Sequence, residues 1–192
     1  MLHDLLKDRK IILASRSPRR AFLLKQVGLK FTQIPSHIEE HLNHMKPEAF
    51  VLHYAQRKAE EIKKYHPNAF IVGADTIVVL NNNIIGKPKN EKDAFLILHK
   101  LSEQCHEVFT GVAILFKDQV ITDFSKTKVY FNPLSDVDIR EYVKTGEPMD
   151  KAGAYGIQGY GSQFIEKIEG CYFNVMGFPI PLFYDMCKRL FS

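Results

Sequence analysis

Short apolar runs alternate with amphipathic stretches along most of the chain. Apolar, β-branched runs bounded by turn residues predict strands over residues 11–15, 30–34, 70–80, 84–85, 108–116, 120–131 and 163–168. Apolar positions at helical spacing, preceded by capping residues, predict helices over 18–27, 47–66, 90–101, 135–144 and 181–191. The asparagine turn at 81–83 predicts a hairpin between the strands on either side of it. This alternation of strands and helices predicts an α/β layered fold.

The first predicted strand runs directly into Ser15-Arg16-Ser17-Pro18-Arg19-Arg20 and a helix that Gly28 ends. Ser17 is a natural N-cap, and Pro18 suits the first helical position. Arg19 and Arg20 then fall in the first turn, where the helix dipole disfavours cations unless an anion binds. Ser15, Ser17 and the two arginines are therefore a candidate phosphate-binding site; the alternative is a solvated turn. We expect Arg19→Ala and Arg20→Ala each to weaken binding of a phosphate-bearing substrate with little loss of stability.

Three charged residues break the local pattern of their elements. Lys58 falls in the middle of the apolar stripe of the helix over 47–66, so it either snorkels, pairs, or reaches a polar cavity. Asp75 interrupts the apolar run 69–80, where a carboxylate must be paired, metal-bound or at a strand break. We favour a functional Asp75, because α/β sites form where strands end. Lys87, in a turn after the hairpin, is a third candidate, although turn lysines are usually only solvated.

Two further segments carry candidate chemistry. Glu39 and Glu40 are adjacent carboxylates that can hold a divalent cation, although such pairs are also common on protein surfaces. The segment 150–159 is rich in glycine and small residues but lacks the GxGxxG dinucleotide fingerprint. It contains Gln158, whose amide offers both a donor and an acceptor. That pair matches N3–H and O4 of uracil or thymine.

Length, charge and cysteine content narrow the class of protein. The 192 residues suit a single domain spanning 1–192 with two lobes, and a net charge of +4 is mild. Basic and acidic residues are mixed, whereas a nucleic-acid-binding protein needs a broad basic face. The 3 cysteines have no paired spacing, which favours reduced thiols in a cytosol. The N-terminal residues are too charged for a secretory signal, and no apolar run is long enough to span a membrane.

Taken together, these segments resemble the Maf family of nucleoside triphosphate pyrophosphatases, nearly from end to end. The matching pieces are Ser15–Arg20, the Glu39-Glu40 region, Ala55–Ala59, Gly73–Thr76, Gly86–Pro88 and Asp150–Gly159. The last piece resembles the branch of the family that acts on dTTP and UTP. Arg16 departs from the pattern, because a small residue is common there; we expect it to alter affinity and not the reaction.

The resemblance implies a two-lobed α/β fold with a mixed sheet, flanking helices and a central cleft, similar to inosine triphosphate pyrophosphatases. It implies hydrolysis between the α and β phosphates, a divalent cation (magnesium or manganese), a homodimer and a cytoplasmic location. It also implies removal of non-standard nucleotides or restraint of cell division as biological roles. A nucleotide-binding regulator of cell division without catalysis is the alternative function.

The chemistry of the candidate residues fits this reaction. Four cations, Arg19, Arg20, Lys58 and Lys87, can neutralise a triphosphate and stabilise charge on the leaving pyrophosphate. Asp75 acts as a general base on water, as a metal ligand, or as both. Glu39 or Glu40 would join it at the metal. The resemblance implies that Thr76 and Gln158 lie near the specificity determinants, and we therefore expect a preference for dTTP and UTP over CTP, dATP and GTP.

Overall fold

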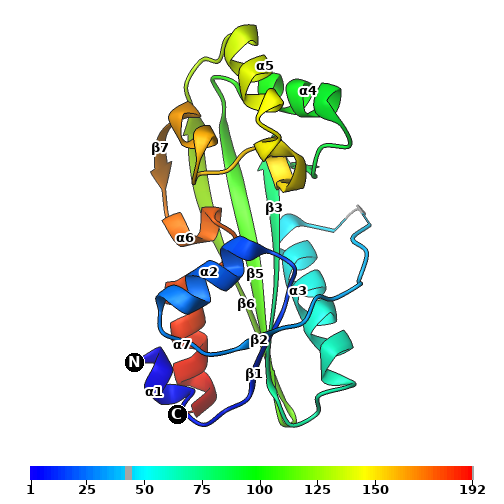
Figure 1. The fold of residues 1–192 in the computed structure, drawn as a ribbon, viewed down its shortest axis with the longest axis vertical. Helices are drawn as coiled ribbons and strands as arrows, with labels where there is room; N and C mark the ends of the chain where they lie inside the picture. Colours follow the sequence, from blue (N-terminus) through cyan, green and yellow to red (C-terminus); the bar gives the residue numbers. More distant parts are fainter. Residues whose placement is uncertain (42–44, 192) are drawn as a thin grey trace.

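The computed structural model describes residues 1–41 and 45–191, which form a mixed sheet covered by helices (Figure 1). The strand order is β2-β1-β3-β5-β6-β7, and β4 pairs with β3 beside this path. Strand β1 is parallel to β2 and β3, whereas the remaining pairs are antiparallel. The strands are β1 (Ile11–Ala14), β2 (Thr32–Gln33), β3 (Phe70–Leu80), β4 (Asn83–Ile85), β5 (Cys105–Phe116), β6 (Gln119–Phe131) and β7 (Ile165–Glu169).

The long strands β3, β5 and β6 run through both lobes of the molecule, and different helices cover them at each end (Figure 1). The helices are α1 (Leu2–Leu5), α2 (Pro18–Gln26), α3 (Pro47–Lys63), α4 (Glu91–Leu101), α5 (Asp136–Lys144), α6 (Tyr172–Val175) and α7 (Ile180–Phe191). In the first lobe, α1, α2 and α7 cover one face of the sheet and α3 covers the other. In the second lobe, α4 and α5 pack over the far ends of the long strands.

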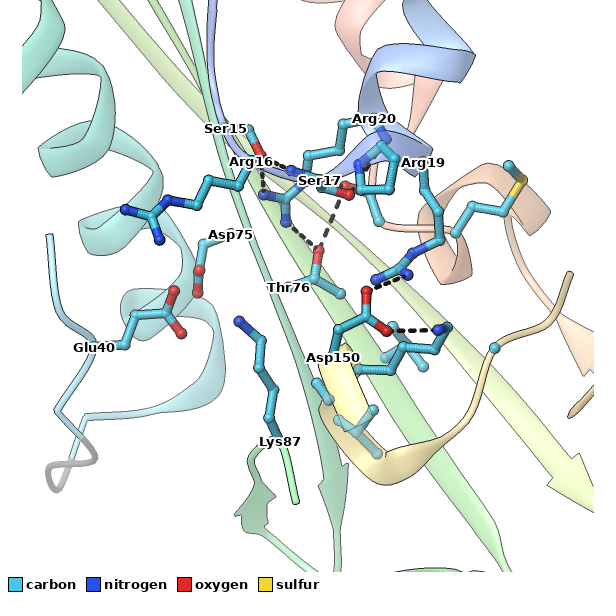
Figure 2. Close-up of a pocket in the computed structure, with 18 of the residues that line it drawn as sticks. Ser15, Arg16, Ser17, Arg19, Arg20, Glu40, Asp75, Thr76, Lys87 and Asp150 are labelled. Carbon is cyan, nitrogen blue, oxygen red and sulfur yellow. Dashed lines mark hydrogen bonds and ion pairs between the residues drawn. The ribbon is translucent and has the colours of Figure 1, made fainter. Parts of the chain in front are cut away.

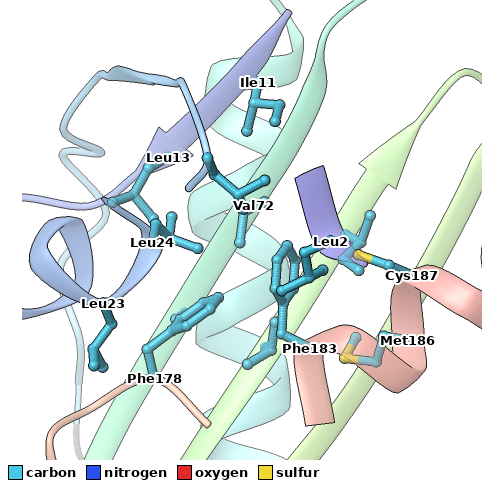
Figure 3. Close-up of a cluster of buried hydrophobic side chains, with 14 of the residues drawn as sticks. Leu2, Ile11, Leu13, Leu23, Leu24, Val72, Phe178, Phe183, Met186 and Cys187 are labelled. Carbon is cyan, nitrogen blue, oxygen red and sulfur yellow. The ribbon is translucent and has the colours of Figure 1, made fainter. Parts of the chain in front are cut away.

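Each lobe has its own apolar core. Side chains from α2 and α7, including Leu24 and Phe183, pack on Leu13 of β1 and Val72 of β3 in the first lobe (Figure 3). The core of the second lobe joins α4 and α5 to β3, β5 and β6. Residues of β3, β5 and β6 contribute to the cores of both lobes. Because burial of apolar side chains is the main favourable contribution to folding, these three strands hold the two lobes together.

A break in strand pairing lies on one edge of β3, between the lobes. Strand β1 pairs with Phe70–Gly73, and β4 pairs with Val78–Leu80. Because β5 pairs with the opposite edge from Ile71 to Val79, the residues 74–77 have no strand partner on the first edge within the described part of the chain. Ligands of α/β proteins bind in crevices beyond the carboxyl ends of strands. This open stretch of edge is therefore the expected place for a site.

The face of β3 that bears Gly73 lies unusually close to α3. A Cβ atom at Gly73 would lie 2.2 Å from the carbonyl oxygen of Ala55, and one at Gly111 on β5 would lie 2.4 Å from that of Val51. Only glycine permits such an approach of helix backbone to sheet. The approach brings the α3 residue Lys58 within reach of β3.

The predicted elements are confirmed in type. Ser17 caps α2 with Pro18 at its start, and Gly28 follows α2 with φ +77°. Asn90 and Ser135 cap α4 and α5. The strand predicted over 163–168 begins later, because residues up to Phe164 form a 3-10 turn that buries that side chain. The sequence did not predict α1, α6 or the 3-10 turns Glu147–Asp150, Ala152–Ala154 and Tyr160–Phe164. None of the helices in the described ranges has the length and apolar character needed to cross a bilayer.

Candidate active site

A cavity of about 750 Å³ lies beside the open edge of β3 (Figure 2). It is bordered by residues of the first lobe from β1, α2 and α3 and by residues of the second lobe, including Val108 and Tyr155. Residues of β3 alternate between its two faces, so Asp75 points toward α3 while Thr76 points toward α2. The cavity therefore receives side chains from both faces of the sheet, and it is the central cleft that was expected.

Arg20 spans the base of the cavity as a buried cross-link. Its Nε donates to the Gly177 carbonyl at 2.8 Å, and its Nη1 donates to Ser15 Oγ at 3.0 Å and to the Ala74 carbonyl at 2.9 Å. Its Nη2 donates to Thr76 Oγ1 at 2.9 Å. Burial lowers the pKa of the guanidinium, but its ordinary value is so high that it stays charged. Most of the Arg20 donors are thus used inside the protein. One of them binds the carbonyl of Ala74, in the stretch of β3 that lacks a strand partner on its open edge among the described residues.

The serines of this segment also bond within the protein. Ser15 is buried, and its Oγ accepts from the Ser17 amide at 3.2 Å as well as from Arg20. Ser17 Oγ accepts from the Arg20 amide as the α2 cap, at 3.4 Å. Thr76 Oγ1 lies 3.0 Å from Thr110 Oγ1 in addition to its bond from Arg20. These hydroxyls border the cavity while holding its wall together.

Arg19 lies on the opposite side of the α2 turn from Arg20 and is partly exposed. Its Nη1 lies 3.1 Å from Asp150 Oδ2, across the cavity from the first lobe to the second (Figure 2). Lys151 Nζ binds the other oxygen of Asp150, at 2.6 Å. The two arginines, which the sequence predicts to act alike, therefore differ in their contacts. Arg20 is buried in the wall of the cavity, whereas Arg19 crosses the cavity to the exposed carboxylate of Asp150.

A partly buried ion-pair cluster, in which Asp75 is buried and Glu40 is exposed, occupies the α3 side of the cavity. Lys58 Nζ lies 2.6 Å from Asp75 Oδ1 and also binds the carboxylate of Glu40. Burial raises the pKa of Asp75 to about 6, although the Lys58 ammonium opposes this shift. Burial also disfavours ionised Glu40, but contact with Lys58 outweighs it and lowers the pKa of Glu40. The two carboxylates are thereby driven to different proton affinities, as expected for a site that uses one of them as a base.

The second oxygen of Asp75 is buried and has no hydrogen-bonding partner among the described residues. An unsatisfied buried acceptor is costly unless a ligand, water or ion completes it. Glu40 faces Asp75 across Lys58, whereas the Glu39 side chain is 85% exposed and lies 4.0 Å from His41. The structure thus brings Glu40, and not Glu39, beside Asp75. The described residues contain no group of three or more histidine, cysteine, aspartate or glutamate side chains fit for a metal.

Lys87 is exposed and points toward Glu40 and Asp75 from the far side of the cavity (Figure 2). It follows Gly86, whose carbonyl accepts a hydrogen bond from the Gly153 amide at 3.1 Å. The loop that carries Lys87 is thus joined to the glycine-rich segment 150–159. Three of the predicted cations, Lys58, Lys87 and Arg19, surround one space.

The glycine-rich segment forms the second-lobe wall of the cavity. Asp150, Tyr155 and Gln158 all border the cavity. The Gln158 side chain is partly buried, and its amide has no hydrogen-bonding partner in the described part of the chain. Sequence reasoning marked the segment but missed that Asp150 pairs with Arg19 and that the Gly177 carbonyl anchors Arg20. The sequence carries no local sign of either contact, because each joins residues far apart along the chain.

Comparisons with known proteins identify the family of this chain. The sequence profile of the family described as Maf-like protein matches residues 10–190. A dTTP/UTP pyrophosphatase of Caldicellulosiruptor saccharolyticus is 46% identical over 189 residues, covering 95% of each chain. A dTTP/UTP pyrophosphatase of a Geobacillus strain is 47% identical over 183 residues, covering 95% of this chain and 98% of that one.

Solved structures also resemble this chain. One is the Ham1 protein of Staphylococcus aureus, with a TM-score of 0.48 and 15% identity, covering 82% of this chain and 80% of the other. The other is a nucleoside-triphosphatase / dITP/XTP pyrophosphatase of Mycobacterium abscessus, with a TM-score of 0.46 and 13% identity, covering 94% and 96%. The profile match over nearly the whole chain and the close relatives along the same length establish the family: this chain belongs to the Maf-like proteins.

Proposed function

We propose that this protein is a nucleoside triphosphate pyrophosphatase that hydrolyses dTTP and UTP to the nucleoside monophosphate and pyrophosphate. The observation that carries the proposal is Asp75, a buried carboxylate with a raised pKa and one unpartnered oxygen, at the floor of a cavity ringed by cations. The relatives named dTTP/UTP pyrophosphatase support the same reaction and substrates.

In this mechanism a water molecule attacks the α-phosphorus, and the bond from that phosphorus to the oxygen bridging to the β-phosphate breaks. The pyrophosphate leaves with the electron pair, and Asp75 accepts a proton from the attacking water. Its raised pKa suits it to hold that proton near neutral pH. Lys58 positions the carboxylate through its 2.6 Å contact.

Positive charge around the cavity supports the departure of pyrophosphate. Arg19, Lys58 and Lys87 reach the cavity from three elements, so they can neutralise phosphate oxygens from several directions. The N-terminus of α2, which Ser17 caps, also borders the cavity and adds the positive end of the helix dipole. Ser15 borders the cavity beside it. Arg20 serves mainly by fixing the geometry of this wall, because most of its donors are bound within the protein.

The residues present fit a divalent cation that binds together with the substrate. Asp75 has a free buried oxygen, and Glu40 offers a second hard oxygen donor beside it. Mg²⁺ is usually held by one or two carboxylates plus substrate phosphates, so Glu40 and Asp75 would hold Mg²⁺ or Mn²⁺ there. When bound, the cation would neutralise part of the negative charge of the phosphates. Glu39, which points away, is not included.

Base recognition is assigned to Gln158. Its unpartnered amide on the second-lobe wall can pair with N3–H and O4 of uracil or thymine, whereas cytosine presents the reverse pattern. Thr76 contributes to the opposite wall, although its hydroxyl already contacts Arg20 and Thr110. We also propose that the protein is cytoplasmic, forms a homodimer, and binds neither nucleic acid nor a membrane.

A nucleotide panel tests the proposal. The protein is incubated with dTTP, UTP, CTP, dATP and GTP and Mg²⁺, with and without excess EDTA, and the product is identified as pyrophosphate or phosphate. Pyrophosphate release from dTTP and UTP that requires the metal is expected. Asp75→Asn should lower turnover by at least about 100-fold, whereas Asp118→Asn, the same change in an exposed turn, should not.

Three results would each contradict a part of this proposal. Phosphate as the product would exclude cleavage between the α and β phosphates. Near wild-type turnover by folded Asp75→Asn would remove that carboxylate from the chemistry. Tight nucleotide binding without any turnover would favour the regulator of cell division instead.

A further inference from the structure

A buried histidine lies behind the second-lobe wall of the cavity and takes no part in the chemistry above. His106 is on β5, is 1% exposed and does not border the cavity. Its Nε2 lies 2.8 Å from the hydroxyl of Tyr155, which does border the cavity. The two residues are far apart in sequence, so this hydrogen bond fastens the glycine-rich segment to the sheet.

Packing alone does not explain an imidazole at this position. The His106 ring meets Phe131 and Tyr155 edge-on, at centroid distances of 5.0 and 5.3 Å, as a phenyl ring would. Burial lowers the pKa of His106 to about 4, so the ring is neutral near neutral pH. Its Nδ1 is buried without a hydrogen-bonding partner among the described residues, which is a cost that a phenyl ring avoids. What the imidazole adds is the bond to Tyr155.

The segment that this bond holds has an unfavourable backbone. Gly153 has φ +72°, and Ala154 has φ +57°, a left-handed conformation that a residue with a Cβ rarely adopts. Surrounding contacts must therefore hold the segment in shape. On one side of the bend the Gly153 amide binds the Gly86 carbonyl, and on the other the Gly156 amide binds the Tyr142 hydroxyl at 3.2 Å. Between these two backbone contacts, the hydrogen bond that joins Tyr155 to His106 holds the segment through a side chain.

We infer that His106 is a positioning residue for base recognition, because its bond to Tyr155 sets the position of the segment that carries Gln158. This inference rests on the proposed function and adds a specificity residue that never touches the nucleotide. An amide that pairs with two atoms of a base at once must be held closely, since a small displacement loses both bonds. His106 supplies that hold from the core.

The test compares His106→Phe and Tyr155→Phe, each of which removes one side of the hydrogen bond and keeps an aromatic ring. For both variants we expect the ratio of kcat/KM for UTP to that for CTP to fall about 10-fold, as for the loss of a base-specific contact. The change should come mainly from a higher KM for UTP, with kcat at saturating UTP within about 3-fold of wild type. The double variant should be no worse than either single variant, because both remove the same bond.

His106→Gln provides the rescue, since its side-chain amide can bond Tyr155 in place of the ring nitrogen. It should recover most of the UTP preference, although it packs less well than phenylalanine. Melting temperatures are measured for all variants. A merely structural role predicts the opposite order, with His106→Phe retaining full UTP preference and His106→Gln the more impaired.

An unchanged ratio of UTP to CTP in folded His106→Phe and Tyr155→Phe would overturn the inference. So would an equal loss of kcat on every nucleotide, because that would indicate general damage to the site. Failure of the proposed function is seen separately: wild-type protein would then release no pyrophosphate from UTP at all. Should His106→Phe fail to fold, Tyr155→Phe alone carries the same expectation.

Discussion

Replacing Arg20 with alanine should destabilise the fold far more than the same change at Arg19. The sequence treats these neighbours as equivalent members of a phosphate-binding turn, with little effect of either on stability. The structure leads to a different prediction for Arg20, which is 9% exposed and donates four hydrogen bonds across the base of the cavity. Arg19 instead makes one ion pair, with Asp150, and both side chains are accessible to water.

The magnitude follows from the groups that lose their donor. Without Arg20, the carbonyls of Gly177 and Ala74 lose a buried partner, at about 1–3 kcal/mol each. The hydroxyls of Ser15 and Thr76 retain other contacts and add little. Relief of the buried charge and entry of water from the cavity offset part of the cost. We expect a loss of about 3–4 kcal/mol, which corresponds to a fall in Tm of about 6–16 °C for a chain of this length.

The assay is urea denaturation followed by circular dichroism, with a thermal melt as a second measurement. Arg19→Ala is the matched control and should stay within about 1 kcal/mol of wild type, because an exposed ion pair contributes little. Its kcat/KM for UTP should nevertheless fall, since it removes a cation from the cavity. A free energy of unfolding for Arg20→Ala within about 1 kcal/mol of wild type would refute the cross-link.

Four further predictions concern the cavity and the close contact between α3 and the sheet beside it. Because Asp75 must be ionised to accept a proton and its pKa is raised to about 6, kcat/KM for UTP should fall as the pH drops below about 6. The residual activity of Lys58→Met should have this limb at higher pH, since the ammonium lowers that pKa; an unmoved limb contradicts the pairing. Gly73→Ala places a Cβ against the carbonyl of Ala55 and should cost about 1–3 kcal/mol in urea denaturation, and a neutral result would show that α3 can move away. Gln158→Leu should lower the preference for UTP over CTP by about 10-fold in kcat/KM, and an unchanged ranking would show that another group reads the base.

Local rules were sufficient for most of the secondary structure. Ser17, Pro18 and Gly28 define the ends of α2 because capping and left-handed conformations depend on a few adjacent residues. The same holds for the long strands β3 and β5, because most of their residues are apolar or β-branched and lie next to one another in the sequence. Lys58 and Asp75 were recognisable because each breaks the pattern of its own element, and the structure joins them at 2.6 Å. A charge in an apolar setting needs a partner wherever it lies.

Tertiary structure decided what depends on contacts between distant segments. Adjacent residues with the same chemistry were separated by the direction in which the backbone points them: Arg20 inward and Arg19 across the cavity, Glu40 toward Asp75 and Glu39 into water. The cavity itself exists because β1 ends and β4 begins at different points along one edge of β3. Such separations are set by long-range packing of strands and helices, whereas the sequence around each residue reports only its own helix, strand or turn.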